Sequence, residues 1–184
     1  MTPNPNLSII VPARDEVMAL GSLVPEIVTG LGDRSFEIII VDDGSKDGTR
    51  HLLDSLCANH KMLRVLRNDL PVGQSAAIRM GVRAAHADLI VTLDGDGQNP
   101  PDQIPLLLAP FDRSGVGALG LVQGQRERRR DTLAKRLASR AANTIRAAML
   151  RDGVRDSGCG MKAFRREAYL DLPWFNHIHR FMPA

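Results

Sequence analysis

The chain has 184 residues, of which 43% are apolar, 24% charged and 4% aromatic, with a formal net charge of +3. This length suits one globular domain with a sizeable core. The few aromatic residues argue against modules that stack bases, so we expect no nucleic-acid partner. Cys57 and Cys159 have neither disulfide-framework nor zinc spacing, which predicts a reducing, cytoplasmic setting. The sequence has no secretory signal and no apolar run near the roughly 18 residues of a membrane span.

Strands and helices are predicted to alternate along the first half of the chain. Short apolar runs predict strands at residues 7–11, 37–41, 62–66 and 89–93. Helices are predicted at 49–60 and 73–87, and between the first two strands apolar residues recur every three or four positions: Leu20, Leu23, Val24, Ile27, Val28 and Leu31. This alternation predicts an α/β fold, a mostly parallel sheet flanked by helices on both faces, as a single domain over residues 1–184.

Polar loops follow three of the predicted strands, with the sequences PARDE, DDGSKDGT and DGDGQ. Turns favour Asp, Gly and Asn, which is enough to explain any one of these loops. Ligands of parallel sheets bind outside the carboxyl ends of the strands, where all three loops would lie side by side. We therefore expect a ligand site at this edge of the sheet.

The loop DGDGQ offers side-chain oxygens at Asp94, Asp96 and Gln98, with glycines between them. Magnesium and manganese prefer carboxylate, water and phosphate oxygens, with few protein carboxylates. The pattern Asp-x-Asp is common by chance, but its place after a buried strand favours a divalent cation, Mg²⁺ or Mn²⁺.

The second half of the chain begins with a predicted fifth strand at 121–125, followed by a helix from about 132 to 150 and a glycine-bearing loop that leads into a short strand or helix. Between 125 and 140 only Glu127 and Asp131 oppose a basic set: Arg126, Arg128, Arg129, Arg130, Lys135, Arg136 and Arg140. This excess predicts an anionic partner, although a solvated charged face would look the same. The ending HRFMPA has no helix cap or polar tail, so we expect a chain truncated at its C-terminus.

Several motifs resemble family 2 glycosyltransferases of the GT-A (Rossmann-like) fold. They are IIVPARDE, EIIIVDDGSKDGT and NDLPVGQSAAIRMGVRAAHADLIVTLDGDGQNPPDQIP, and together they extend over most of the chain. The stretches DGDGQNPP, DSGCGMKAFRRE and FNHIHRFMPA are most similar to the branch that transfers sugars to dolichyl or undecaprenyl phosphate. The resemblance implies a nucleotide-sugar donor, a polyprenyl-phosphate acceptor and a membrane surface as partners.

The resemblance also implies roles for individual residues. In the nucleotide pocket it places Pro12, Arg14 and Glu16, with Asp43 at the base edge and Val41 as a backbone contact. Asp94 would lie by the ribose and diphosphate, while Asp96 and Gln98 would bind the metal. Arg126 would face the diphosphate or the acceptor phosphate, and Asp156 would line the site with its role open. Relatives often carry Asn at position 14, so Arg14 does not indicate which base is bound.

The expected activity is inverting, metal-dependent transfer to a polyprenyl phosphate at the cytoplasmic face of the inner membrane, with the protein peripheral to the membrane or anchored in it. An anionic phosphate acceptor needs no strong general base, whereas a hydroxyl acceptor does, and Asp156 is the candidate for that role. Two other interpretations stay open: a family 2 transferase that glycosylates a hydroxyl, and a nucleotide-sugar-binding module without activity. Association into a homo-oligomer stays open as well.

Some polar residues are expected to serve the fold. Asp42 is predicted to stabilise its own turn, and Cys159 to pack as a small apolar side chain. The pair His177 and His179 could hold a metal, but a solvated or acceptor-side loop is the preferred interpretation.

Overall fold

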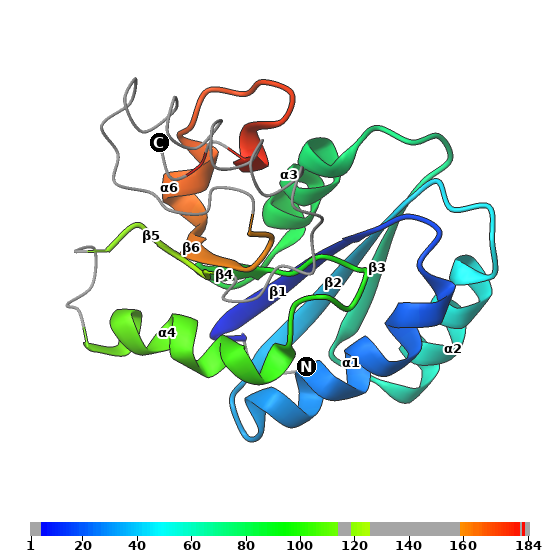
Figure 1. Cartoon of the computed structure of the whole chain (residues 1–184), viewed down its shortest axis with the longest axis horizontal. Coiled ribbons are helices and arrows are strands. Elements are labelled where there is room, and N and C mark those ends of the chain that lie inside the picture. The colour runs from blue at the N-terminus through cyan, green and yellow to red at the C-terminus, as the bar shows by residue number, and fades with distance from the viewer. Residues whose placement is uncertain (1–4, 114–118, 126–158, 181, 183–184) are drawn as a thin grey trace, which may run out of the picture.

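A six-stranded sheet forms the centre of the protein. The computed structural model describes residues 5–113, 119–125, 159–180 and 182. The strand order is β3-β2-β1-β4-β6-β5 (Figure 1). The strands are β1 (Leu7–Ala13), β2 (Phe36–Asp43), β3 (Leu63–Asn68), β4 (Leu89–Thr92), β5 (Leu121–Gln123) and β6 (Lys162–Arg165). β1 is parallel to β2 and β4, and β2 to β3, whereas β6 runs antiparallel to β4 and β5.

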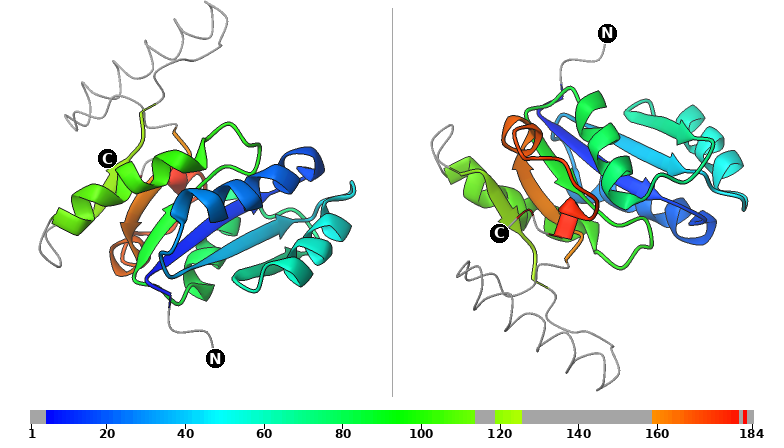
Figure 2. Two further views of the ribbon diagram at one scale, coloured as in Figure 1. Left: turned by 90° about the horizontal axis from the view of Figure 1, so that it is seen from below. Right: turned by 90° about the horizontal axis from the view of Figure 1, so that it is seen from above.

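Helices cover both faces of the sheet, as the sequence predicts (Figure 2). One face carries α1 (Val17–Leu31), α2 (Thr49–Asn59) and α4 (Ile104–Arg113), and the other carries α3 (Gln74–Ala84) and α6 (Arg166–Leu170). Successive residues of a strand point to opposite faces. Thus Ile9 packs under α1 while Ile10 packs under α3, and both are fully buried. This burial on both faces explains why the strands read as continuous apolar runs.

Apart from small shifts in strand bounds, the structure differs from the predicted elements at three places. Helix α4 and the preceding 3₁₀ turn Pro101–Gln103 were not predicted, because the prolines of NPPDQIP are typical of a loop. In fact Pro101 begins the turn, where a missing N–H costs nothing. Helix α3 ends at Ala84 and β5 at Gln123, both earlier than predicted. The helix predicted at about 132–150 lies outside the described residues.

A buried carboxylate ties the amino ends of the strands together. Glu37 Oε1 accepts hydrogen bonds from Ser8 Oγ and the His86 amide, both at 2.7 Å, and Arg64 donates to Oε2 at 2.6 Å. Burial alone would raise the pKa of Glu37, but these hydrogen bonds outweigh it and hold that pKa below its ordinary value. This cluster lies at the opposite ends of the strands from the polar loops, so it stabilises the fold.

Candidate active site

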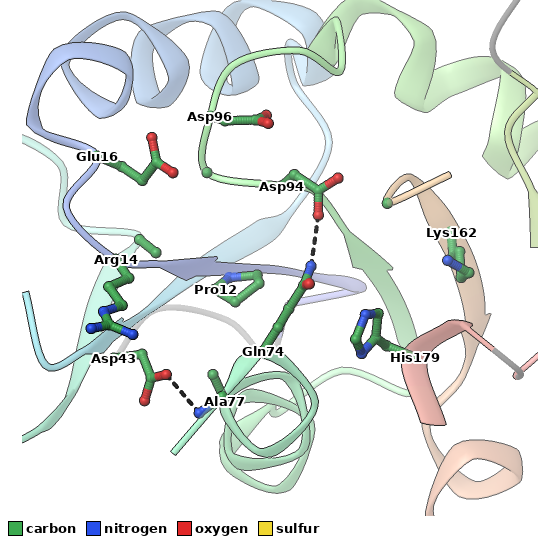
Figure 3. A pocket seen from close by; sticks show the side chains of 14 residues that line it. Pro12, Arg14, Glu16, Asp43, Gln74, Ala77, Asp94, Asp96, Lys162 and His179 are labelled. Atoms are coloured by element: carbon green, nitrogen blue, oxygen red, sulfur yellow. Dashed lines mark hydrogen bonds between the residues drawn. The ribbon is translucent and has the colours of Figure 1, made fainter. Parts of the chain in front are cut away.

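The polar loops meet in one cavity at the carboxyl ends of the parallel strands (Figure 3). The cavity has a volume of about 430 Å³. Its walls come from β1, β2 and β4, from the first turns of α3, and from two segments near the end of the chain: Pro12, Ala13, Arg14, Glu16, Asp43, Gly73, Gln74, Ala77, Asp94, Gly95, Asp96, Gly160, Lys162 and His179. The order β2-β1-β4 brings the three polar loops together, as the strand pattern predicts.

The loop after β1 is held by the loop after β2. Asp15 has a positive φ of 57°, and its carboxylate accepts a hydrogen bond from the Lys46 amide at 2.7 Å. The Asp15 amide in turn donates to Ser45 Oγ, and the Glu16 amide donates to Thr49 Oγ1, each at 3.0 Å. These contacts fix the backbone on either side of Glu16, so its carboxylate is presented to the cavity from a defined position.

Asp43 organises the loop that leads into α3. Its Oδ1 accepts hydrogen bonds from Asn68 Nδ2 at 2.9 Å and the Val72 amide at 2.8 Å, and its Oδ2 accepts from the Gly73 amide at 2.8 Å. A carboxylate has about four acceptor positions, so roughly one is left on Oδ2 for a ligand. The neighbouring Asp42 accepts from the Ser45 amide at 3.0 Å, which confirms the prediction that it stabilises its own turn.

Asp94 is positioned by two amide side chains. Gln74 Nε2 donates to Oδ1 at 2.9 Å and Asn99 Nδ2 donates to Oδ2 at 3.2 Å. On its other side lies Gly160, where an added Cβ would come within 2.0 Å of Asp94 Oδ2. Only a glycine fits there unless the carboxylate moves, so Gly160 belongs to the site although it carries no functional group.

Negative charge accumulates around Asp96 and Glu16. Asp96 is exposed, and its Oδ1 accepts only the amide of Gln98 from its own loop, at 3.0 Å, among the contacts of the described residues. The pKa of Glu16 is raised, first by burial and then by the charges of Asp96, Asp47, Asp15 and Asp94. Carboxylates that repel one another in this way form a favourable environment for a cation.

The described residues fit a divalent cation that is shared with a ligand, more than a cation held by protein alone. Among the described residues no group of three or more His, Cys, Asp or Glu side chains is arranged to hold a metal. Asp94 and Asp96 would supply the one or two carboxylates that Mg²⁺ typically takes when phosphates and waters complete its shell. The donors are all hard oxygens, which suits Mg²⁺ or Mn²⁺ over softer metals.

His179, Lys162 and Gln74 line the cavity although the sequence did not single them out for it. His179 is buried, and its Nδ1 lies 2.5 Å from Ser75 Oγ in the first turn of α3. The buried Lys162 donates to the backbone oxygen of Cys159. His177 is exposed, so the two histidines do not form a pair in the cavity. No local pattern identifies these residues, because each is brought in by an element distant in sequence.

Six predicted site residues line the cavity: Pro12, Arg14, Glu16, Asp43, Asp94 and Asp96. Val41 and Gln98 do not line it. The Val41 side chain is fully buried against α3, and Gln98 is exposed on the loop beyond Asp96. Arg126 and Asp156 lie outside the described residues. Cys159 is buried in the main core cluster, which confirms its predicted packing role.

The family model for glycosyl transferase family 2 matches residues 8–172, which include nearly the whole sheet and nearly the whole cavity lining. The chain belongs to glycosyl transferase family 2. The six cavity residues predicted from the resemblance therefore lie in the matched region.

A curated family 2 relative is the dodecaprenyl-phosphate galacturonate synthase of Rhizobium johnstonii. It is 31% identical to this glycosyltransferase domain in an alignment 182 residues long, which covers 97% of the chain and 53% of the relative. The chain thus spans about half the length of this relative.

Solved structures agree on the fold. Glucosyl-3-phosphoglycerate synthase from Mycobacterium tuberculosis in complex with UDP has a TM-score of 0.72 at 24% identity, covering 92% of this chain and 60% of its own. A mannosyltransferase from Pyrobaculum calidifontis in complex with GDP-Man and Mn²⁺ has a TM-score of 0.64 at 21% identity, covering 90% of this chain and 46% of its own. Within the part of the chain that the structure describes, no helix is long and apolar enough to cross a membrane.

Proposed function

We propose that this family 2 domain transfers a sugar from a nucleotide-sugar, linked to GDP or UDP, to a polyprenyl phosphate, with inversion at the anomeric carbon. The reaction would use Mg²⁺ or Mn²⁺ and take place at the cytoplasmic face of the inner membrane, with the protein peripheral to it or anchored in it. The observation that carries the proposal is the gathering of Glu16, Asp94 and Asp96 around one cavity at the strand ends. The name of the Rhizobium relative supports the lipid-phosphate acceptor.

The donor would occupy the cavity between β2 and β4. Asp43 would accept a hydrogen bond from the base through the acceptor position left on Oδ2, while Pro12 and Arg14 line the same wall. Asp94, held by Gln74 and Asn99, would lie beside the ribose and diphosphate. Because its two hydrogen bonds fix its side chain before a ligand arrives, this side chain loses little conformational entropy on binding.

Asp96, with Asp94 beside it, would hold the cation, and Gln98 stays a predicted ligand from the same loop. A bound cation neutralises charge on the departing diphosphate as a Lewis acid. The mutual repulsion that raises the pKa of Glu16 would then be relieved, which links occupancy of the donor site to the stability of the protein.

The acceptor phosphate would approach the anomeric carbon from the side opposite the diphosphate, which produces inversion. It is already anionic, so no strong general base is required, and Asp156 is assigned no such role. The basic segment from Arg126 to Arg140 would interact with the anionic acceptor or the membrane surface. Arg126, closest to the end of β5, would contact the reacting phosphates.

The test is a thermal-shift titration with nucleotide-sugars, with and without Mn²⁺, on the parent and on Asp96→Asn. A ligand that binds the folded state raises the melting temperature. Asp96→Asn should lose the Mn²⁺-dependent part of the shift, whereas Asp102→Asn, an exposed carboxylate in the 3₁₀ turn before α4, should keep it. A mutant that binds donor and Mn²⁺ like the parent would show that the acidic edge is only a turn.

The acceptor is tested by radiolabelled transfer with the full-length protein. Turnover with undecaprenyl phosphate, and none with sugar acceptors, supports the proposal. Turnover with a glycan hydroxyl alone would identify the alternative transferase, and donor binding without transfer or hydrolysis would indicate a binding module. Arg126→Ala should lower turnover at saturating lipid, whereas Arg128→Ala and Arg129→Ala should mainly weaken binding to vesicles.

A further inference from the structure

A second cavity lies on the outer side of α3, away from the carboxylates. It has a volume of about 400 Å³ and is lined by Ala76, Arg79, Met80, Arg83 and Trp174. Trp174 comes from the segment that follows α6, and this segment runs alongside α3 in the right view of Figure 2. We call these residues, together with the adjacent Phe175, the α3 patch.

The α3 patch presents large aromatic side chains to solvent. Trp174 and Phe175 are each 43% exposed, which is unusual in a chain with only 4% aromatic residues. The guanidinium of Arg79 lies 5.1 Å from the centre of the Trp174 ring, so the cation and the ring hold each other in place. An aromatic side chain held at the surface beside a cation combines an apolar contact with a charged one.

The positive charge of the α3 patch has no acidic partner among the described residues. Arg79 and Arg83 are four residues apart on α3 and therefore share a helix face, where like charges repel. None of the salt bridges among the described residues includes either arginine. Arg166, the next basic residue, donates to the backbone oxygens of Val82 and Arg83 and brings no negative charge.

Two buried polar atoms beside the α3 patch also have no hydrogen-bond partner in the described part of the chain. They are Arg79 Nη1 and the hydroxyl of Tyr169. Burial raises the pKa of Tyr169 to about 12, and the charge of Arg79 opposes that rise, which places the two groups within electrostatic range. A buried guanidinium nitrogen without an acceptor is costly, so an anionic ligand at the exposed side of Arg79 would stabilise this side chain through its charge.

We propose that the α3 patch docks on the surface of an anionic phospholipid bilayer. Arg79 and Arg83 would take lipid phosphate oxygens, for which guanidinium groups have matching geometry. Trp174 would enter the headgroup region, where an aromatic ring with one polar side is favoured, and Phe175 beside it would add an apolar contact. A membrane fits this combination better than a protein partner, because paired arginines without acidic neighbours match a dense layer of phosphates.

The position of α3 gives this docking a consequence for the active site. Gln74 and Ala77 of α3 line the first cavity, while Ala76, Arg79, Met80 and Arg83 of the same helix line the second. Docking through α3 would therefore bring the active-site cavity to the bilayer. The inference rests on the membrane setting of the proposed function, but docking needs no donor or cation, so it is measured separately from transfer.

Trp174 is the one tryptophan of the 184 residues, and it reports on this surface directly. Its fluorescence is recorded on adding vesicles of phosphatidylcholine with or without phosphatidylglycerol, without nucleotide-sugar or metal. We expect a blue shift and quenching by brominated lipid with the anionic vesicles, both reversed by high salt. Phosphatidylcholine alone should give neither.

Variants separate the α3 patch from the basic segment at 126–140. Arg79→Gln/Arg83→Gln should weaken partitioning to anionic vesicles roughly thirtyfold, because each basic residue near such a surface contributes about 1 kcal/mol and the two together about 2 kcal/mol. Arg83→Glu keeps the Arg79–Trp174 contact and should also weaken partitioning to anionic vesicles. Lys61→Gln/Arg113→Gln removes the same charge from exposed positions in the turn before β3 and at the end of α4, and should bind like the parent.

Unchanged vesicle binding in both α3 variants, or a Trp174 spectrum that does not respond to anionic vesicles, would overturn the proposal. A Trp174 shift that follows protein concentration without lipid would identify a second copy of the chain as the occupant, and would overturn it too. If the α3 variants lose vesicle binding but bind the donor like the parent, docking through the α3 patch is supported and the nucleotide site is unaffected. Failure of the docking proposal and failure of the proposed function can therefore be told apart.

Discussion

His179 Nδ1 lies 2.5 Å from Ser75 Oγ, and this contact joins the last described turn of the chain to the first turn of α3. Gln74, the residue before Ser75, donates to Asp94 at 2.9 Å. A short series of contacts therefore runs from the C-terminal segment, through the start of α3, to a carboxylate of the donor site. The position of that carboxylate depends on a residue 85 positions later in the chain.

His179→Ala should weaken nucleotide-sugar binding severalfold and lower the free energy of unfolding by about 1–2 kcal/mol, because it leaves the buried Ser75 without its partner. Calorimetric titration with the donor and thermal melts measure the two effects. The control is His177→Asn, since His177 is exposed and has a φ of 67°, a conformation that Asn tolerates. Donor affinity equal to the parent's would show that His179 serves only the fold.

Gly160→Ala should displace the Asp94 carboxylate, although it changes no charge in the cavity. The new Cβ would meet Asp94 Oδ2 at 2.0 Å, so the carboxylate must leave its hydrogen bonds with Gln74 and Asn99. We expect a destabilisation of about 1–3 kcal/mol, typical of overpacking, and a clear loss of donor affinity. In Gly120→Ala the Cβ meets nothing within 4 Å, so that variant should behave like the parent in both melts and titrations.

Asp43→Ala should weaken binding of the free nucleoside as well as of the nucleotide-sugar, even with EDTA present, because base recognition needs no cation. It should also cost about 1–3 kcal/mol, since the Val72 and Gly73 amides lose their acceptor. Asp69→Ala, at an exposed position of the same loop, is the comparison. An Asp43→Ala protein that melts early but binds nucleoside normally would restrict Asp43 to holding the loop.

Glu16→Gln should make the protein more stable without metal and less responsive to Mn²⁺. The pKa of Glu16 is raised above 4.5 in the folded state by burial and by neighbouring carboxylates. Its favourable contribution to the free energy of unfolding is therefore complete below pH 4.5 and is lost as pH rises through the folded-state pKa. Melts across this range should show the parent falling below the mutant by up to about 0.5 kcal/mol, the scale of exposed charge interactions.

The control for that series is Glu26→Gln, which removes the same charge from an exposed position of α1. It should follow the parent at every pH and keep the full Mn²⁺ shift. If the two mutants have the same pH profile, the carboxylates around Glu16 do not repel one another enough to matter, and Asp96 loses its main support as a cation ligand.

The sequence alone determined the parallel part of the sheet and the edge where the site lies. Runs such as EIIIV must be buried on both faces, and helical spacing between them leaves few topologies other than strands covered on both sides. Since parallel strands end at one edge, Asp43, Asp94 and Asp96 had to lie near one another. Local pattern and chain direction were sufficient for this, because each polar loop directly follows its own strand.

Only the tertiary structure decided which residues complete the cavity. β6 enters the sheet antiparallel between β4 and β5, which brings Lys162 into the cavity wall and places Gly160, just before the strand, beside Asp94. Packing of the C-terminal segment on α3 brings His179 into the wall of the cavity and Trp174 to the outer face of the same helix. These placements depend on long-range packing, which has no periodic signature in the sequence. The same packing closes the active-site cavity on one side of α3 and leaves Arg79 and Arg83, on the other side, without an acidic partner among the described residues.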